Sequence, residues 1–162
     1  MVDRKPAPAA GAEQRLTELG IVLPSPPTPF GNYAEGVRIG KLLYLSGMLP
    51  VIDRKPQFVG RLGAELEVDE GRRAAEIATM SALSAIKAEL GSLDRVTAVA
   101  KLGIYIATVG DFRDHPTVAD GASDLLAKVF GPEMLSGRIV LGVASLPLGL
   151  PVEVELLVEV AD

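Results

Sequence analysis

Residues 152–160 read Val-Glu-Val-Glu-Leu-Leu-Val-Glu-Val, and this stretch decides the fold class. Its two ends alternate strictly between apolar and acidic residues, as a β-strand with one buried face does. The alternation places Glu153, Glu155 and Glu159 on one face of the strand and the valines on the other. The chain is therefore expected to contain a sheet with an apolar face that needs a covering layer.

Two segments with helical spacing supply that layer. Residues 68–90 repeat small and apolar side chains along one helical face, which allows a close approach to a sheet. Asp69 is expected to cap this helix, and Gly91 stands where a helix-ending glycine belongs. Pro116, at a first helical position, begins a second helix that is expected to end at Val129.

The remaining apolar runs predict the other strands of the sheet. The run over residues 42–45 is nearly continuous, so it is expected to be buried on both faces, and residues 53–63 are expected to form a polar loop. The order β-β-α-β-α-β-β predicts an α+β fold, a single mixed sheet with two helices on one face. The opposite face still carries apolar residues, which favours its burial against another subunit. The four further strands are predicted over residues 32–38, 42–45, 96–106 and 139–145.

The first 30 residues are expected to form a leader to a single domain at residues 31–162. Residues 1–12 are interpreted as mobile, and residues 13–19 as a short helix that ends at Gly20. Residues 24–29 contain four prolines, so this connector must be extended.

Composition excludes several classes of function. The chain has no cysteine, which removes disulfides and thiol chemistry, and its one histidine, His115, cannot form a two-histidine metal site. We therefore expect neither a metal nor an organic cofactor. A net charge of −5 lowers the expectation of nucleic-acid binding. The sequence has neither a run of about 18 apolar residues nor a secretory signal, so a cytoplasmic location away from membranes is expected.

Three stretches resemble the YjgF/RidA family of enamine/imine deaminases, also described as endoribonuclease L-PSP-like. The most specific is Arg138 followed by Gly-Val-Ala-Ser-Leu-Pro at residues 142–147 and Val-Glu-Val-Glu at residues 152–155. The others are Asn-Tyr-Ala-Glu-Gly-Val at residues 32–37 with Leu-Ser-Gly at 45–47, and residues 120–131. The resemblance, which is to a divergent bacterial subgroup, implies the chorismate-mutase-like fold. It also implies a homotrimer with its sheets facing inward and a ligand cleft between each pair of subunits.

The resemblance also implies a set of site residues. Arg138 is expected to clamp a substrate carboxylate, Glu153 to stand at the rim as the acid–base group, and Tyr33 and Ser46 to line the pocket. The expected substrate-binding residues are Arg138, Gly47, Met48, Asp120 and Val140. Some of these depart from the family pattern: Met48 follows Gly47 where many members have glutamine, and Asp120 replaces a frequent asparagine. Ile139 and Val140 replace small residues, which implies a more apolar pocket floor and argues against the smallest substrates.

These residues suit hydrolysis of an imine or enamine that carries a carboxylate, giving a keto acid and ammonia. A guanidinium pairs with a carboxylate, a glutamate can move a proton between water and nitrogen, and positioning can supply most of the remaining rate. Simpler interpretations stay open: Arg138 as a surface charge, Glu153 as its neutralising partner, and Ser46 as a turn residue. The alternative functions are a non-catalytic trimer that binds or senses small carboxylates and, third, a ribonuclease or translation inhibitor.

Overall fold

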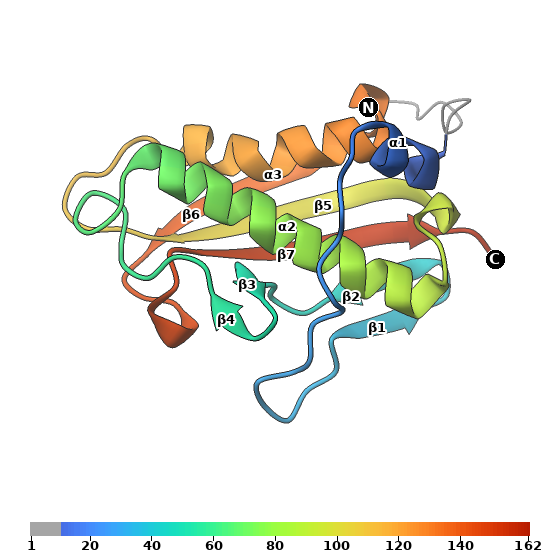
Figure 1. Ribbon diagram of the computed structural model, residues 1–162, viewed down its shortest axis with the longest axis horizontal. Helices are drawn as coiled ribbons and strands as arrows, with labels where there is room; N and C mark the ends of the chain where they lie inside the picture. Colours follow the sequence, from blue (N-terminus) through green and yellow to red (C-terminus); the bar gives the residue numbers. More distant parts are fainter. Residues whose placement is uncertain (1–10) are drawn as a thin grey trace.

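A five-stranded mixed sheet carries two long helices on one face (Figure 1). The computed structural model describes residues 11–162, so most of the predicted mobile leader lies outside the described residues. The strand order is β1-β2-β7-β5-β6, with β5 and β6 parallel and the other pairs antiparallel. The predicted α+β architecture is confirmed. The strands are β1 (Gly36–Ile39), β2 (Leu42–Leu45), β5 (Val96–Ala107), β6 (Gly137–Val143) and β7 (Val152–Val160).

The helices lie close to their predicted bounds. They are α1 (Ala12–Glu18), α2 (Val68–Leu90) and α3 (His115–Phe130). The predicted cap of α2 is wrong: Glu67, not Asp69, occupies the N-cap and forms a reciprocal capping box with Glu70. Gly91 ends the helix at φ 82°, as predicted. A methyl group at Gly121 of α3 would overlap the backbone carbonyl of Arg72, so the two helices can cross closely only because this position is glycine.

Three predictions about residues 32–63 are wrong. The first strand begins at Gly36 rather than at residue 32. Within the single chain β2 is buried on one face only, because Leu43 and Leu45 lie in the core whereas Tyr44 is 43% exposed. The predicted polar loop after residue 53 overlaps a hairpin of β3 (Val51–Ile52) and β4 (Lys55–Pro56).

The face of the sheet opposite the helices is open. Strand register places Val37, Ile39 and Tyr44 on this face at the β1–β2 end, and Ile139 and Leu141 on it along β6. All five side chains are exposed large hydrophobics in the single chain. No helix in the described part of the chain is long and apolar enough to cross a membrane.

The segment between α1 and β1 crosses the outer surface of α2 on its way to the sheet (Figure 1). The side chain of Leu16 anchors α1 in the core. Ser84 of α2 then donates a hydrogen bond from its hydroxyl to the carbonyl of Pro24, at 2.7 Å. The proline-rich stretch that follows is called the connector below (residues 24–30). It is held against α2 at this point and reaches the end of β2, where the candidate site lies.

Candidate functional site

A cleft of about 440 Å³ opens where the end of β2 meets the start of β7. Ser46 and Gly47 follow β2, Glu153 is the second residue of β7, and Tyr33 belongs to the segment that leads into β1. We call this the Glu153 cleft. Its complete lining is Phe30, Gly31, Tyr33, Ser46, Gly47, Leu49, Pro147, Leu148 and Glu153. Four of the predicted site residues, Tyr33, Ser46, Gly47 and Glu153, are therefore brought together by the fold.

Glu153 is the ionisable group of this cleft. The alternation of β7 directs it away from the core, while its neighbours Val152 and Val154 are fully buried. Burial raises the pKa of the Glu153 carboxyl above the 4.5 of an ordinary glutamate. The carboxyl packs directly on Gly47, where a methyl group would overlap it. Within residues 11–162 no hydrogen bond or ion pair engages this carboxyl, so it is available to water or to a ligand.

The two hydroxyl groups of the cleft are already oriented. Ser46 donates a hydrogen bond to the carbonyl of Ala34 at 2.6 Å, which leaves its oxygen free to accept one. Tyr33 accepts a hydrogen bond at 3.3 Å from the backbone N–H of Phe30, which leaves its own O–H free to donate. The Glu153 cleft therefore offers a ligand a hydrogen-bond acceptor, a hydrogen-bond donor and an unpaired carboxyl.

The next carboxylate along β7 is engaged. Glu155 accepts a hydrogen bond from the Tyr105 hydroxyl at 2.9 Å and lies 3.7 Å from the Lys101 ammonium. The hydrogen bond to Glu155 raises the pKa of Tyr105. Glu153 and Glu155 share a strand and a face, yet only Glu153 lacks such partners among the described residues. The structure thus distinguishes a carboxylate with partners, Glu155, from one without them among the described residues, Glu153.

Arg138 does not line the Glu153 cleft. It projects from β6 towards α3, where it donates hydrogen bonds to Asp120 at 2.7 Å and to Ser123 at 3.0 Å. Its side chain is 27% exposed. Val140, two residues along β6, lies on the same face and packs against the core. Arg138 and Asp120 therefore form a second cluster, with Val140 on the same face of β6, and the single chain does not join it to the Glu153 cleft.

Met48 has a mainly structural position. Its backbone forms a bridge with Val154, and its side chain is 2% exposed, within the core. One edge of the Met48 side chain reaches a second cavity beside the Glu153 cleft.

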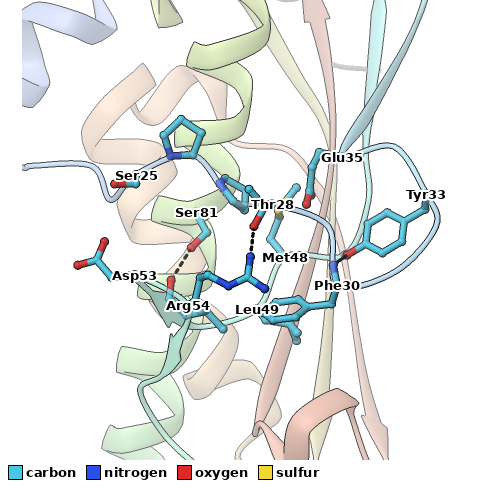
Figure 2. Close-up of a pocket in the computed structure, with 14 residues that line it drawn as sticks. Ser25, Thr28, Phe30, Tyr33, Glu35, Met48, Leu49, Asp53, Arg54 and Ser81 are labelled. Carbon is cyan, nitrogen blue, oxygen red and sulfur yellow. Dashed lines mark hydrogen bonds between the residues drawn. The ribbon is translucent and has the colours of Figure 1, made fainter.

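This second cavity, called the connector cavity, was missed by sequence reasoning. It has a volume of about 390 Å³ and lies between the connector, α2 and the β3–β4 hairpin (Figure 2). Phe30, Glu35 and Arg54 line it, and none of them is among the residues predicted from the sequence. The proline-rich composition of the connector is the one sequence signal near it. That composition predicts an extended chain but not the surface on which the chain folds back.

A family model described as "YjgF/chorismate_mutase-like, putative endoribonuclease" matches residues 13–160. The chain belongs to the YjgF/RidA family. The match begins within α1, so the YjgF/RidA pattern extends over the connector as well as over the sheet.

Individual relatives agree with this assignment. Protein TCP17 of Trypanosoma cruzi is 43% identical over 145 residues, which are 89% of this chain and 91% of that protein. The crystal structure of Atu1372 from Agrobacterium tumefaciens, a protein of unknown function, is 37% identical with a TM-score of 0.85, covering 93% of this chain and 92% of that one. A 2-iminobutanoate/2-iminopropanoate deaminase of Dermatophagoides farinae is 29% identical over 139 residues, 85% of this chain and 93% of that enzyme. The YjgF/RidA family thus includes imine deaminases as well as proteins named for endoribonuclease activity.

Proposed function

We propose that this YjgF/RidA protein hydrolyses a reactive imine or enamine that carries a carboxylate, releasing ammonia and a keto acid. The observation that carries the proposal is the carboxyl of Glu153, which is half-buried, has a raised pKa and has no partner among the described residues. A raised pKa makes this carboxylate a stronger base than an exposed glutamate and brings its pKa closer to neutral pH, which suits a group that first takes and then returns a proton.

The chemistry needs one proton carrier. Glu153 takes a proton from water as the water oxygen adds to the carbon of the protonated imine, and the new C–O bond gives a neutral carbinolamine. Glu153 then returns that proton to nitrogen and the C–N bond breaks as the C=O bond forms. The hydroxyl proton departs with ammonia as ammonium, and the keto acid remains. An enamine enters the same route after its carbon gains a proton. The Ser46 oxygen and the Tyr33 hydroxyl are suited to hold the water or the carbinolamine by accepting and donating hydrogen bonds.

We propose further that the carboxylate of the substrate is held by Arg138 of a neighbouring protomer in a homotrimer. Two features support this arrangement. Arg138 lies outside the Glu153 cleft of its own chain, and the open sheet face carries exposed Val37, Ile39 and Leu141 that a second copy would cover. A guanidinium at such an interface offers bidentate pairing to a carboxylate.

One observation favours a second candidate, a trimer that binds small carboxylates without turnover. Arg138 is already paired with Asp120, so part of its charge is neutralised before a ligand arrives. A binding protein tolerates this loss because it needs only equilibrium affinity, whereas an enzyme needs the clamp in each turnover. Binding of a keto acid with no acceleration of imine hydrolysis would support this candidate over the deaminase.

The experiment is a measurement of ammonia release from imines generated in place by an amino-acid oxidase. Wild type should exceed buffer, and Arg138→Ala should raise the KM for the imine about 10- to 100-fold, the effect of losing a charge-assisted hydrogen bond. Arg72→Ala is the matched control, because Arg72 also pairs with an α3 carboxylate, that of Asp124. Equal rates for wild type and buffer would contradict the deaminase. RNA cleavage by the same highly purified protein would revive the ribonuclease alternative.

A further inference from the structure

We propose that the connector cavity is the subsite for the substrate's side chain, and that the preferred imines carry a bulky, uncharged and largely apolar group. This inference rests on the proposed deaminase function, because it names the substrate class of the same site. It concerns a cavity beside the Glu153 cleft, most of whose lining takes no part in the hydrolytic chemistry.

The lining of the connector cavity is mostly apolar. Pro26, Pro27 and Phe30 form one wall from the connector, Met48 and Leu49 form another from the segment after β2, and Val51 closes it from the hairpin. Ser81 of α2 also lines the cavity, but its hydroxyl is 3.4 Å from the carbonyl of Val51 and so has a partner (Figure 2). Walls that are mainly apolar favour apolar ligands.

The connector is fastened above this cavity at two points. Ser84 holds its first residue, Pro24, from α2. Arg54 of the hairpin holds its far end: the guanidinium donates a hydrogen bond to the Thr28 hydroxyl at 2.7 Å and lies 5.7 Å from the centre of the Phe30 ring (Figure 2). A wall fixed at both ends forms a defined pocket rather than a loose loop.

The connector cavity adjoins the Glu153 cleft. Phe30, Tyr33, Gly47 and Leu49 line both. Gly47 has no side chain to separate them, so a substrate with its imine carbon at Glu153 can direct its side chain past Gly47 into the cavity. A methyl side chain would leave about 390 Å³ of this space without contacts, whereas a branched or aromatic side chain would use it.

Charge in the connector cavity excludes acidic side chains. The carboxyl of Glu35 lines it and has no hydrogen bond or ion pair to its side chain within residues 11–162, and Asp53 lies at the same wall as Arg54. The Arg54 guanidinium is the cation of this lining, and it is already engaged by Thr28 and Phe30. Imines of dicarboxylic amino acids would bring a second negative charge to Glu35, so they should be poor substrates.

The test compares imines made from phenylalanine, alanine and glutamate. We expect kcat/KM for the phenylalanine imine to exceed that for the alanine imine at least about tenfold, with the glutamate imine below both. Val51→Phe should fill the cavity and reduce the phenylalanine-to-alanine ratio towards one. Ile52→Phe is the matched control, since Ile52 is the next residue of the same strand and lines neither the cavity nor the cleft. A second pair of variants, Arg54→Ala and its control Lys55→Ala, tests whether Arg54 holds the connector in place. Only Arg54→Ala should lower the ratio of kcat/KM for the phenylalanine imine to kcat/KM for the alanine imine.

Calorimetric titration with pyruvate and phenylpyruvate separates this inference from the proposed function. If no imine is turned over but phenylpyruvate binds more tightly than pyruvate and Val51→Phe abolishes the difference, the subsite stands and the deaminase does not. If imines are turned over with the same ratio in wild type, Val51→Phe and Arg54→Ala, the deaminase stands and the subsite is overturned. Thermal unfolding of each variant shows that the comparison is made between folded proteins.

Discussion

Arg138 and Glu153 project from opposite faces of one sheet, on the two strands that flank β5. Arg138 is in register with Leu102, whose side chain lies in the core under the helices, and it pairs with Asp120 of α3. Glu153 is in register with Tyr105, on the open face. One protomer therefore keeps the Arg138 guanidinium and the Glu153 carboxyl apart, and the proposed site, which uses both, draws them from two chains.

Replacing Glu153 with glutamine tests the proton carrier. Because glutamine keeps the shape but cannot accept a proton, Glu153→Gln should lower kcat for imine hydrolysis about 100-fold or more. Glu159→Gln is the control, since Glu159 lies on the same face of β7 and hydrogen-bonds only to the Thr97 hydroxyl at the surface. The measurement is the rate of ammonia release, and a Glu153→Gln enzyme with wild-type kcat would remove Glu153 from the chemistry.

The same substitution should stabilise the fold at neutral pH. The folded chain holds a proton on Glu153 more tightly than the unfolded chain does, because burial raises the pKa above 4.5. The contribution of this proton to the free energy of unfolding is therefore fully present below pH 4.5, and it is lost as the pH rises through the pKa of Glu153 in the folded chain. Because glutamine does not ionise, Glu153→Gln removes this loss of stability. Its melting temperature should therefore exceed that of wild type at pH 7. The difference between the two melting temperatures should shrink as the pH falls below 4.5. A difference that is constant over this range would contradict the assigned direction.

We expect Asp120 to weaken the binding of an anion by Arg138. Asp120→Asn removes the competing charge but keeps a hydrogen-bond acceptor for Arg138, so affinity for a keto acid should rise about two- to fivefold, the equivalent of a partly exposed ion pair. Asp124→Asn, one turn along α3, breaks the pair with Arg72 instead and should leave this affinity unchanged. Calorimetric titration of both variants with pyruvate checks the prediction, and a weaker Asp120→Asn complex would mean that Asp120 supports binding.

Gly47 should tolerate no side chain while Glu153 stays in place. A methyl group at this position overlaps the Glu153 carboxyl, so Gly47→Ala should displace it and lower kcat/KM about tenfold or more. A methyl group at Gly137 would have its nearest neighbour, the Ala100 carbonyl, at 3.8 Å, which makes Gly137→Ala the control. Recovery of activity in the double variant Gly47→Ala with Glu153→Asp would show that the loss arises from this overlap, since aspartate is shorter. Full activity in Gly47→Ala alone would contradict the close packing.

The elements that the sequence predicts well are those with a long, regular pattern. Helix α2 has both predicted bounds because its small-residue face repeats over 23 residues and Gly91 ends it. Strand β7 has the predicted bounds because valine and glutamate alternate at both of its ends. The Arg138 and Glu153 positions follow from the family pattern, but the pattern gives no indication that they lie on opposite faces.

The features that the sequence does not predict depend on contacts between distant segments. The hairpin of β3 and β4 turns at Asp53 and Arg54, both at positive φ, where the sequence offers no glycine to mark the turn. The connector cavity exists because Ser84 and Arg54 hold the proline-rich segment against α2 and the hairpin, and these partners are 60 and 26 residues away from the groups they bind. No local pattern encodes either contact.

The most direct test of the shared site is complementation between two variants, each strongly impaired when the substrate concentration lies well below the KM. Arg138→Ala chains retain Glu153, and Glu153→Gln chains retain Arg138, so a mixed trimer contains some interfaces with both groups intact. If the two variants are unfolded together and refolded at equal concentration, ammonia release should recover to about a quarter of the wild-type rate, since one ordered pair of neighbours in four joins the intact halves. A refolded mixture that stays as slow as its two parents, whether light scattering shows trimers or monomers, would contradict a site built from two protomers.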